Sequence, residues 1–255
     1  MKRFLYILML LFILITVISI SSSGQDSIPQ IVSFPESSQQ IDEGIHQFIK
    51  TKFIEGSALF MSSIALCLII GLSFCLERII YLNLAQINSK KFLSEIERKM
   101  NENAVDEAKE IARNTRGPVA SICFQAISRI NGSIEEIDKS ITATGSVQTG
   151  LLEKNLSWIS LFIAISPSIG FLGTVVGMVI AFEDIQQYGD ITPTIIAGGM
   201  KIALITTVGG LIVAIMLQLF YNYILSKIEG IVNEMENDSI TILDIISQFK
   251  RRSAK

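Results

Sequence analysis

The sequence predicts an all-α membrane protein, with three transmembrane helices and long cytoplasmic helical extensions after an N-terminal signal peptide. Hydrophobic residues make up 49% of the 255 residues, and the mean hydropathy is +0.49. Long uncharged runs carry most of that hydrophobicity, and the basic residues fall between and after them. These are the features of an integral membrane protein rather than of a soluble domain.

Composition also narrows the functional classes. The formal net charge is -3, and the scattered basic residues form no dense patch, so we expect no nucleic acid partner. Cys67 and Cys75 lie in an apolar run and Cys123 in an amphipathic segment, which favours reduced packing residues over disulfides. The lone His46 lacks further ligand-type residues at suitable spacing, so we expect no metal or cofactor. We find no nucleophile-base pair or phosphate loop, and we expect no enzymatic activity.

The N-terminus has the pattern of an export signal. Lys2 and Arg3 precede an apolar run over residues 4–20, and small polar residues follow. We therefore predict a signal peptide over residues 1–24, with an uncleaved signal anchor as the alternative. Residues 25–52 are polar and read as a periplasmic segment.

The first predicted span covers residues 53–76. Residues 56–76 contain no charge and suffice to cross a hydrocarbon core of about 30 Å. Residues 77–156 then form a predicted cytoplasmic helical domain, placed inside the cell by its basic residues. They include Lys90, Lys91, Arg98, Lys99, Lys109, Arg113 and Arg116.

Helical periodicity and end signals subdivide this cytoplasmic domain. Apolar residues recur every four positions at Phe92, Ile96 and Met100. Gly117-Pro118 should end one helix and begin the next. Ser133 with Glu136 forms a capping-box pattern. Because we see no strong breaker after it, we expect one long helix to continue from there through the second span.

The remaining chain completes the topology. We predict a second span over residues 157–182, a short acidic periplasmic loop over 183–193 and a third span over 194–223. A cytoplasmic C-terminal helix over 224–255 ends in Lys250, Arg251, Arg252 and Lys255.

The second and third spans are rich in small and hydroxyl residues, which let helices approach closely in lipid. In the second span these are Ser166, Pro167, Ser168, Gly170, Gly173, Thr174 and Gly177, and the last two glycines form a GxxxG pair. In the third they are Gly198, Gly199, Ala203, Thr206, Thr207, Gly209, Gly210 and Ala214. We expect a bundle around a polar path.

These two spans contain no Asp, Glu or His. Their one charge, Lys201, either extends its stem to the outer headgroups or pairs with a carboxylate of a partner or of the loop at Asp190. Threonines in membrane helices often bond back to their own helix. Thr174 and Thr207 nevertheless fall at similar depths on oppositely directed helices, so they can meet near the bilayer midplane. The result is a polar ring without its own proton carrier.

Two motifs resemble those of a known family. Residues 167–178, PSIGFLGTVVGM, look like the P-x-x-G-L-L-G-T-V-x-G-M pattern of the MotA/TolQ/ExbB proton channel subunits. Residues 203–215, ALITTVGGLIVAI, are similar to the family's A-L-x-x-T-x-x-G-L-x-x-A-I. Glu77-Arg78 adds a weaker match. The ExbB/TolQ branch fits best, since a flagellar MotA stator would have four spans and a larger cytoplasmic domain.

The resemblance implies a homo-oligomer, in this family a pentamer, in the bacterial inner membrane. Its second and third helices would line a pore around the helices of an ExbD/TolR-like single-span subunit, whose membrane aspartate carries the proton. Thr174 and Thr207, with Thr206 beside them, would face that aspartate. Many members have a glutamate five residues before the second threonine, where this chain has Ile202, so Lys201 could tune the partner carboxylate.

The function implied by the resemblance is an ExbB-like subunit that couples the proton-motive force to a TonB-like protein and outer-membrane transport. The alternatives are a TolQ-like envelope-integrity motor and a non-conducting membrane scaffold. Sodium could replace the proton, because threonine hydroxyls coordinate either hydrated species. For helix packing we single out Pro167, Gly170, Gly173, Gly177, Gly209 and Gly210.

Overall fold

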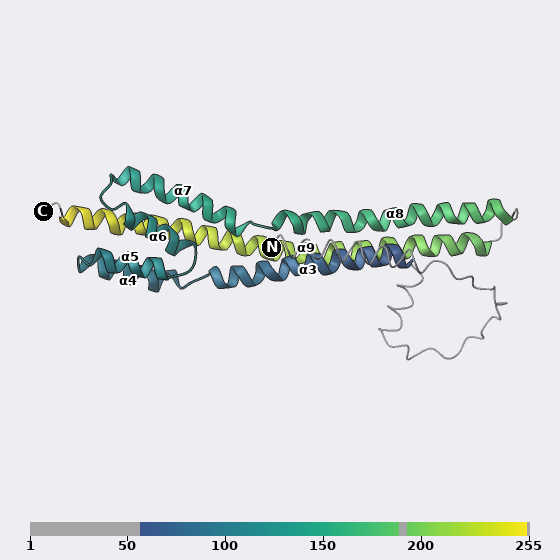
Figure 1. The fold of residues 1–255 in the computed structure, drawn as a ribbon, viewed down its shortest axis with the longest axis horizontal. Coiled ribbons are helices and arrows are strands. Elements are labelled where there is room, and N and C mark those ends of the chain that lie inside the picture. Colours follow the sequence, from purple (N-terminus) through teal and green to yellow (C-terminus); the bar gives the residue numbers. More distant parts are fainter. Residues whose placement is uncertain (1–56, 189–192, 254–255) are drawn as a thin grey trace, which may run out of the picture. The chain divides into compact units, whose positions relative to one another are not determined.

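The computed structural model describes residues 57–188 and 193–253, and in these ranges all regular structure is helical (Figure 1). The helices are α3 (Ala58–Ala85), α4 (Ser89–Asn101), α5 (Val105–Asn114), α6 (Pro118–Ser128), α7 (Ile134–Leu152), α8 (Leu156–Tyr188) and α9 (Pro193–Ser253). The predicted signal peptide, the predicted periplasmic segment with His46, and residues 189–192 of the predicted loop before α9 lie outside the described residues. Residues 183–188 of that predicted loop are helical, because α8 continues to Tyr188.

The chain divides into two compact units. Within the described ranges, the first unit contains residues 57–72 and 161–218, and the second contains residues 73–160 and 219–253. The division falls inside α3, α8 and α9, so each of these helices contributes to both units.

Three helical stretches of the described chain are long and apolar enough to cross a membrane: Ala58–Asn101, Ile134–Gln187 and Ile196–Ser253. Their most apolar windows have mean hydropathies of 2.4, 2.0 and 2.3, yet only 22 to 28% of each window is buried. Large apolar side chains such as Phe171 and Leu204 are more than half exposed. Exposed apolar surface on this scale would be unusual in water and is ordinary in lipid.

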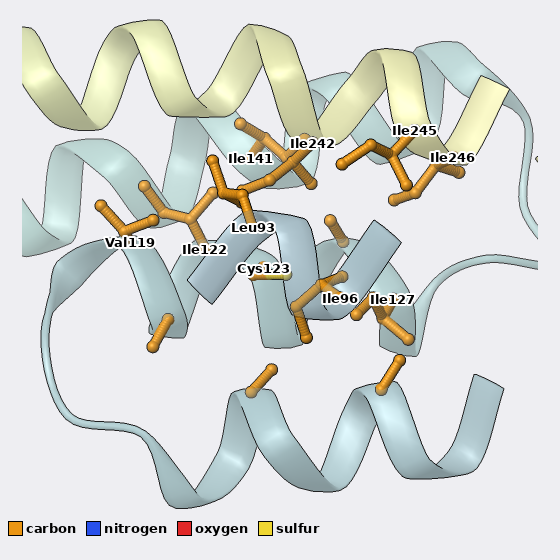
Figure 2. Close-up of a cluster of buried hydrophobic side chains, with 14 of the residues drawn as sticks. Leu93, Ile96, Val119, Ile122, Cys123, Ile127, Ile141, Ile242, Ile245 and Ile246 are labelled. Atoms are coloured by element: carbon orange, nitrogen blue, oxygen red, sulfur yellow. The ribbon is translucent and has the colours of Figure 1, made fainter. Parts of the chain in front are cut away.

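The second unit has its own hydrophobic core, formed by residues of α4, α5, α6, α7 and the C-terminal half of α9 (Figure 2). The predicted periodic residues Phe92, Ile96 and Met100 are all buried in it. Cys123 is fully buried there too, and the three cysteines are free. The three cysteines therefore pack in the interior, as expected.

Two predicted helix starts are also confirmed. Gly117 has a φ of 114°, and Pro118 begins α6. A side chain at Gly117 would be strained at this φ, and its Cβ would lie 2.7 Å from the carbonyl oxygen of Ala85. At α7, the Ser133 hydroxyl accepts from the Glu136 amide at 3.1 Å, and the Glu136 carboxylate accepts from the Ser133 amide at 2.9 Å.

The prediction of one long helix from Ser133 through the second span is wrong. α7 ends at Leu152 and α8 begins at Leu156. Asn155, between them, has a φ of 67°, a left-handed conformation that asparagine tolerates better than most residues. Its side-chain amide donates to the carboxylate of Glu77 at 3.0 Å, which helps to hold the break in place.

The Glu77-Arg78 pair does not end its helix, because α3 continues to Ala85. Arg78 is 1% exposed, and its guanidinium donates to the carbonyl oxygens of Leu151, at 3.2 Å, and Leu152. These carbonyls belong to the last turn of α7, where no helical partner remains for them. Arg78 thus fastens α3 to the end of α7, and Glu77 fastens it to the break that follows.

Candidate functional site

The small residues of α8 form one buried face in the first unit. Ser166, Gly170, Gly173, Gly177 and Ala181 are all buried, and they follow one another at spacings of three and four residues. Such spacing aligns side chains along one side of a helix. The small residues of the second span therefore share one buried side of α8.

This face lies directly against α9, with almost no side-chain volume between the two backbones. A Cβ added to Gly170 would lie 2.8 Å from the carbonyl oxygen of Thr206, and one added to Gly210 would lie 2.5 Å from that of Ser166. At Gly177 the nearest atom would be the carbonyl oxygen of Gly199, at 3.1 Å. At Gly170 and Gly210 the contact leaves no room for a Cβ, and at Gly177 a Cβ would be tightly packed. Such close approach is typical of helix pairs in membranes.

The other predicted packing residues have different surroundings. Gly209 faces α3, where the nearest atoms to an added Cβ belong to Met61, at 3.4 Å. Pro167 is half-buried inside α8 and removes one backbone donor there. The flanking hydroxyls bond back within the helix, Ser166 to the carbonyl of Phe162 at 2.6 Å and Ser168 to that of Ala164 at 2.9 Å.

The three predicted threonines come together at the centre of this contact. The hydroxyls of Thr174 on α8 and Thr207 on α9 share a hydrogen bond. The Thr174 hydroxyl also lies 3.2 Å from the carbonyl oxygen of Ala203 and 3.3 Å from that of Gly170. The Thr207 hydroxyl reaches the same two carbonyls at the same two distances. Two hydroxyls and two carbonyls from both helices thus form one polar group.

Thr206 has a different environment from its neighbour. It is fully buried, whereas Thr174 and Thr207 are half-buried. Its hydroxyl donates to the carbonyl of Ala203 at 2.9 Å and lies 3.3 Å from that of Gly170. Thr206 therefore packs the helix contact, while the other two threonines retain accessible surface.

Lys201 lies on the same helix as Thr206 and Thr207 but on a different face. It is exposed on α9, and five residues separate it from the buried Thr206. Five residues correspond to about 140° around a helix, so the two side chains leave different faces.

In the second unit, two carboxylates of α9 lie one helical turn apart, at Glu234 and Asp238. The Ser89 hydroxyl donates to the Glu234 carboxylate at 2.8 Å, one turn before Asp238 on α9. Burial raises the pKa of the Asp238 carboxyl above its usual range. A hydrogen bond with Ser89 lowers this pKa, and the negative charge of Glu234 raises it further. The buried Oδ2 of Asp238 has no hydrogen-bond partner among the described residues.

Sequence reasoning missed two contributors to these arrangements. Ala203 was noted only as a small residue, although its carbonyl accepts from all three threonines. Arg78 was noted only as a weak motif match, and an arginine directly after an apolar run was the available signal. No group of three or more His, Cys, Asp or Glu residues that could hold a metal occurs in the described part of the chain.

These observations define a class: an all-helical protein with three potential membrane helices, two of which meet through glycines and enclose threonine hydroxyls. Residues 97–237 match the model of the MotA/TolQ/ExbB proton channel family, which is more than half of the chain. The chain belongs to this family.

Curated relatives place it beside proteins named ExbB. A biopolymer transport protein ExbB homolog of Methanothermobacter thermautotrophicus is 27% identical over 169 residues, which cover 66% of this chain and 60% of the relative. Biopolymer transport protein ExbB of Helicobacter pylori is 37% identical over 76 residues, 30% of this chain and 52% of the relative. Biopolymer transport protein exbB1 of Vibrio cholerae is 34% identical over 86 residues, which cover 31% of this chain and 38% of the relative. The match therefore spans less than two thirds of each of these three proteins.

Proposed function

We propose that this chain is an ExbB-like subunit of a complex that converts the proton-motive force into mechanical work at the bacterial inner membrane. Four features support this: membership of the family, the names of the relatives, three apolar helices and the threonine group between α8 and α9. In this proposal the loop before α9 and the N-terminal segment are periplasmic, and the second unit and the C-terminus are cytoplasmic.

The observation that carries the proposal is the pair of half-buried hydroxyls, Thr174 and Thr207, on otherwise apolar helices. Polar groups in a membrane are costly, so they face a protein interior or a water-filled path rather than lipid. Hydroxyls can hydrogen-bond a carboxylate in either of its protonation states, because they both donate and accept. The two hydroxyls can therefore line a path beside a proton carrier, but they do not themselves release protons at neutral pH.

The carrier therefore belongs to a partner. The predicted second and third spans hold no Asp, Glu or His, so the carboxylate is supplied by an ExbD/TolR-like single-span subunit. A proton crossing the membrane yields about 2.3 kcal/mol per 100 mV, which alternate charging of that carboxylate converts into helix movement. Several copies of this chain, a pentamer in the family, surround the partner, and a TonB-like protein receives the work.

Proton flux into liposomes tests the proposal, using the chain alone and the chain with the aspartate-bearing subunit. We expect flux or motor function only with the partner and its aspartate. Thr174→Val and Thr207→Val should assemble normally and lose function, since valine keeps the shape and removes the hydroxyl. Thr174→Ser should retain it. Ser168→Ala is the matched control, because it removes an exposed hydroxyl of the same helix. Full activity in both valine variants would refute the hydroxyl role.

A non-conducting scaffold is the second candidate, and one observation favours it. Each of the three threonine hydroxyls already reaches a backbone carbonyl, as purely structural threonines do. The same variants separate the two functions: a scaffold predicts that Thr174→Val and Thr207→Val weaken assembly, whereas a conducting subunit predicts intact assembly with lost function.

A further inference from the structure

Two grooves in the second unit lie along opposite flanks of α7. The α7 residues of the first groove occur at positions 139, 140, 143, 144, 147 and 148, and those of the second include 138, 141, 142, 145, 146 and 149. At about 100° per residue, the two sets point to nearly opposite sides of the helix. Their volumes are similar, about 600 and 680 Å³.

The first groove lies between α7 and the α5–α6 pair, and its charged residues are all basic. They are Arg113, Arg129 and Lys139. Lys139 also pairs with Glu135 at 2.9 Å, but both side chains are about three-quarters exposed, so this bond is weak. Val147, which is 62% exposed, supplies an apolar surface within the groove. We call it the basic groove.

The second groove lies between α7 and α9, and its charged residues are all acidic: Asp138, Glu153, Glu236 and Asp244. Ile240, which is 64% exposed, lies within it as Val147 lies within the first. We call it the acidic groove. Each groove thus combines an exposed aliphatic side chain with charges of a single sign, and the signs are opposite.

We propose that the basic groove of one copy docks against the acidic groove of the next. An apolar centre with a charged rim is the usual composition of a protein interface, and opposite charges fix its orientation. A contact between two different faces of the same chain is head-to-tail, and such a contact forms a ring when the rotation from one copy to the next divides a full turn. This inference rests on the proposed homo-oligomer and assigns the surfaces through which its second units meet.

Cysteine cross-linking in membranes tests it, using two differently tagged full-length copies, one with Val147→Cys and the other with Ile240→Cys. We expect a disulfide between the two tags, and at least about fivefold less when either cysteine variant is expressed with its own kind. Ser94→Cys, exposed on α4 and outside both grooves, replaces Val147→Cys as the control. The native cysteines are buried and should not react.

Charge reversal provides the second arm. Arg113→Glu with Arg129→Glu should lower the cross-link about tenfold, because like charges then face each other across the contact. When both tagged copies also carry Glu236→Lys and Asp244→Lys, the cross-link between Val147→Cys and Ile240→Cys should be restored. Lys90→Glu with Lys91→Glu, exposed and outside both grooves, is the charge-matched control. If an anionic lipid fills the basic groove instead, the acidic-side changes will not rescue.

Each outcome has a separate meaning. An oligomer of unchanged native mass without the Val147–Ile240 cross-link would overturn this contact and leave the proposed function standing. Equal cross-linking of like with like would replace the head-to-tail contact by a symmetric one and would also overturn it. A monomer would overturn both the contact and the oligomer on which the proposed function depends.

Discussion

Gly173→Ala provides a direct test of the contact between α8 and α9. The added Cβ would lie 2.7 Å from the Thr206 hydroxyl oxygen, 2.9 Å from its Cβ and 3.1 Å from its Cγ2. Thr206 is fully buried and bonded to the Ala203 carbonyl, so it cannot turn away. Overpacking of this kind costs about 1 to 3 kcal/mol.

Gly198→Ala is the matched control, because the same Cβ on the same helix pair meets no atom within 4 Å. Both variants gain up to about 1 kcal/mol of helix propensity, so their difference isolates the contact. At about 2 to 4 °C per kcal/mol, Gly173→Ala should unfold about 2 to 12 °C below Gly198→Ala in detergent.

A double-mutant cycle sharpens the result. Thr206→Ala removes two of the three clashing atoms, so Gly173→Ala should cost about 1 kcal/mol less in that background. Equal unfolding temperatures for Gly173→Ala and Gly198→Ala would refute the close packing, and strict additivity with Thr206→Ala would refute its assignment to that side chain.

Four further outcomes are expected. Gly173→Leu should prevent assembly, which an unchanged native complex mass would contradict. Arg78→Met should cost about 1 to 3 kcal/mol, since it leaves the buried Leu152 carbonyl without its donor; chemical denaturation that matches wild type would disprove this. Gly117→Ala should destabilise the second unit by at least about 1 kcal/mol through its positive φ, measured by hydrogen exchange, with protection equal to wild type as the contrary result. The pKa of Asp238 is raised in the folded protein, so the folded protein loses stability as the pH rises through that pKa and the carboxyl ionises. Asp238→Asn should therefore have a higher melting temperature than wild type at neutral pH, and the two melting temperatures should converge below the ordinary carboxyl pKa. A difference in melting temperature that does not change with pH would contradict this prediction.

Features carried by local sequence were the ones that could be predicted. Ser133 with Glu136 and Gly117 with Pro118 define helix ends through their own chemistry, and the structure has both. Apolar length likewise predicted the membrane helices. Such signals need no knowledge of what lies nearby.

Features that depend on distant partners were missed or misjudged. Asn155 reads as an ordinary helix residue until Glu77 is placed beside it, 78 positions earlier in the chain. Arg78 reads as the polar end of a span until the carbonyls of α7 surround it. The threonines could be paired because depth and direction follow from topology, but the shared carbonyls of Gly170 and Ala203 follow only from the packing of the glycine face.

The hydroxyl pair of Thr174 and Thr207 has a consequence beyond its position. Either oxygen can serve as the donor in their shared hydrogen bond, and the other proton then turns to a carbonyl of Gly170 or Ala203. The pair thus has two donor orders whose dipoles point in opposite directions, and exchange between them requires only rotation about two C–O bonds. Such rotations are far faster than collective helix motions. If a charge arrived beside the pair, the two hydroxyl dipoles would therefore reorient before any helix moved.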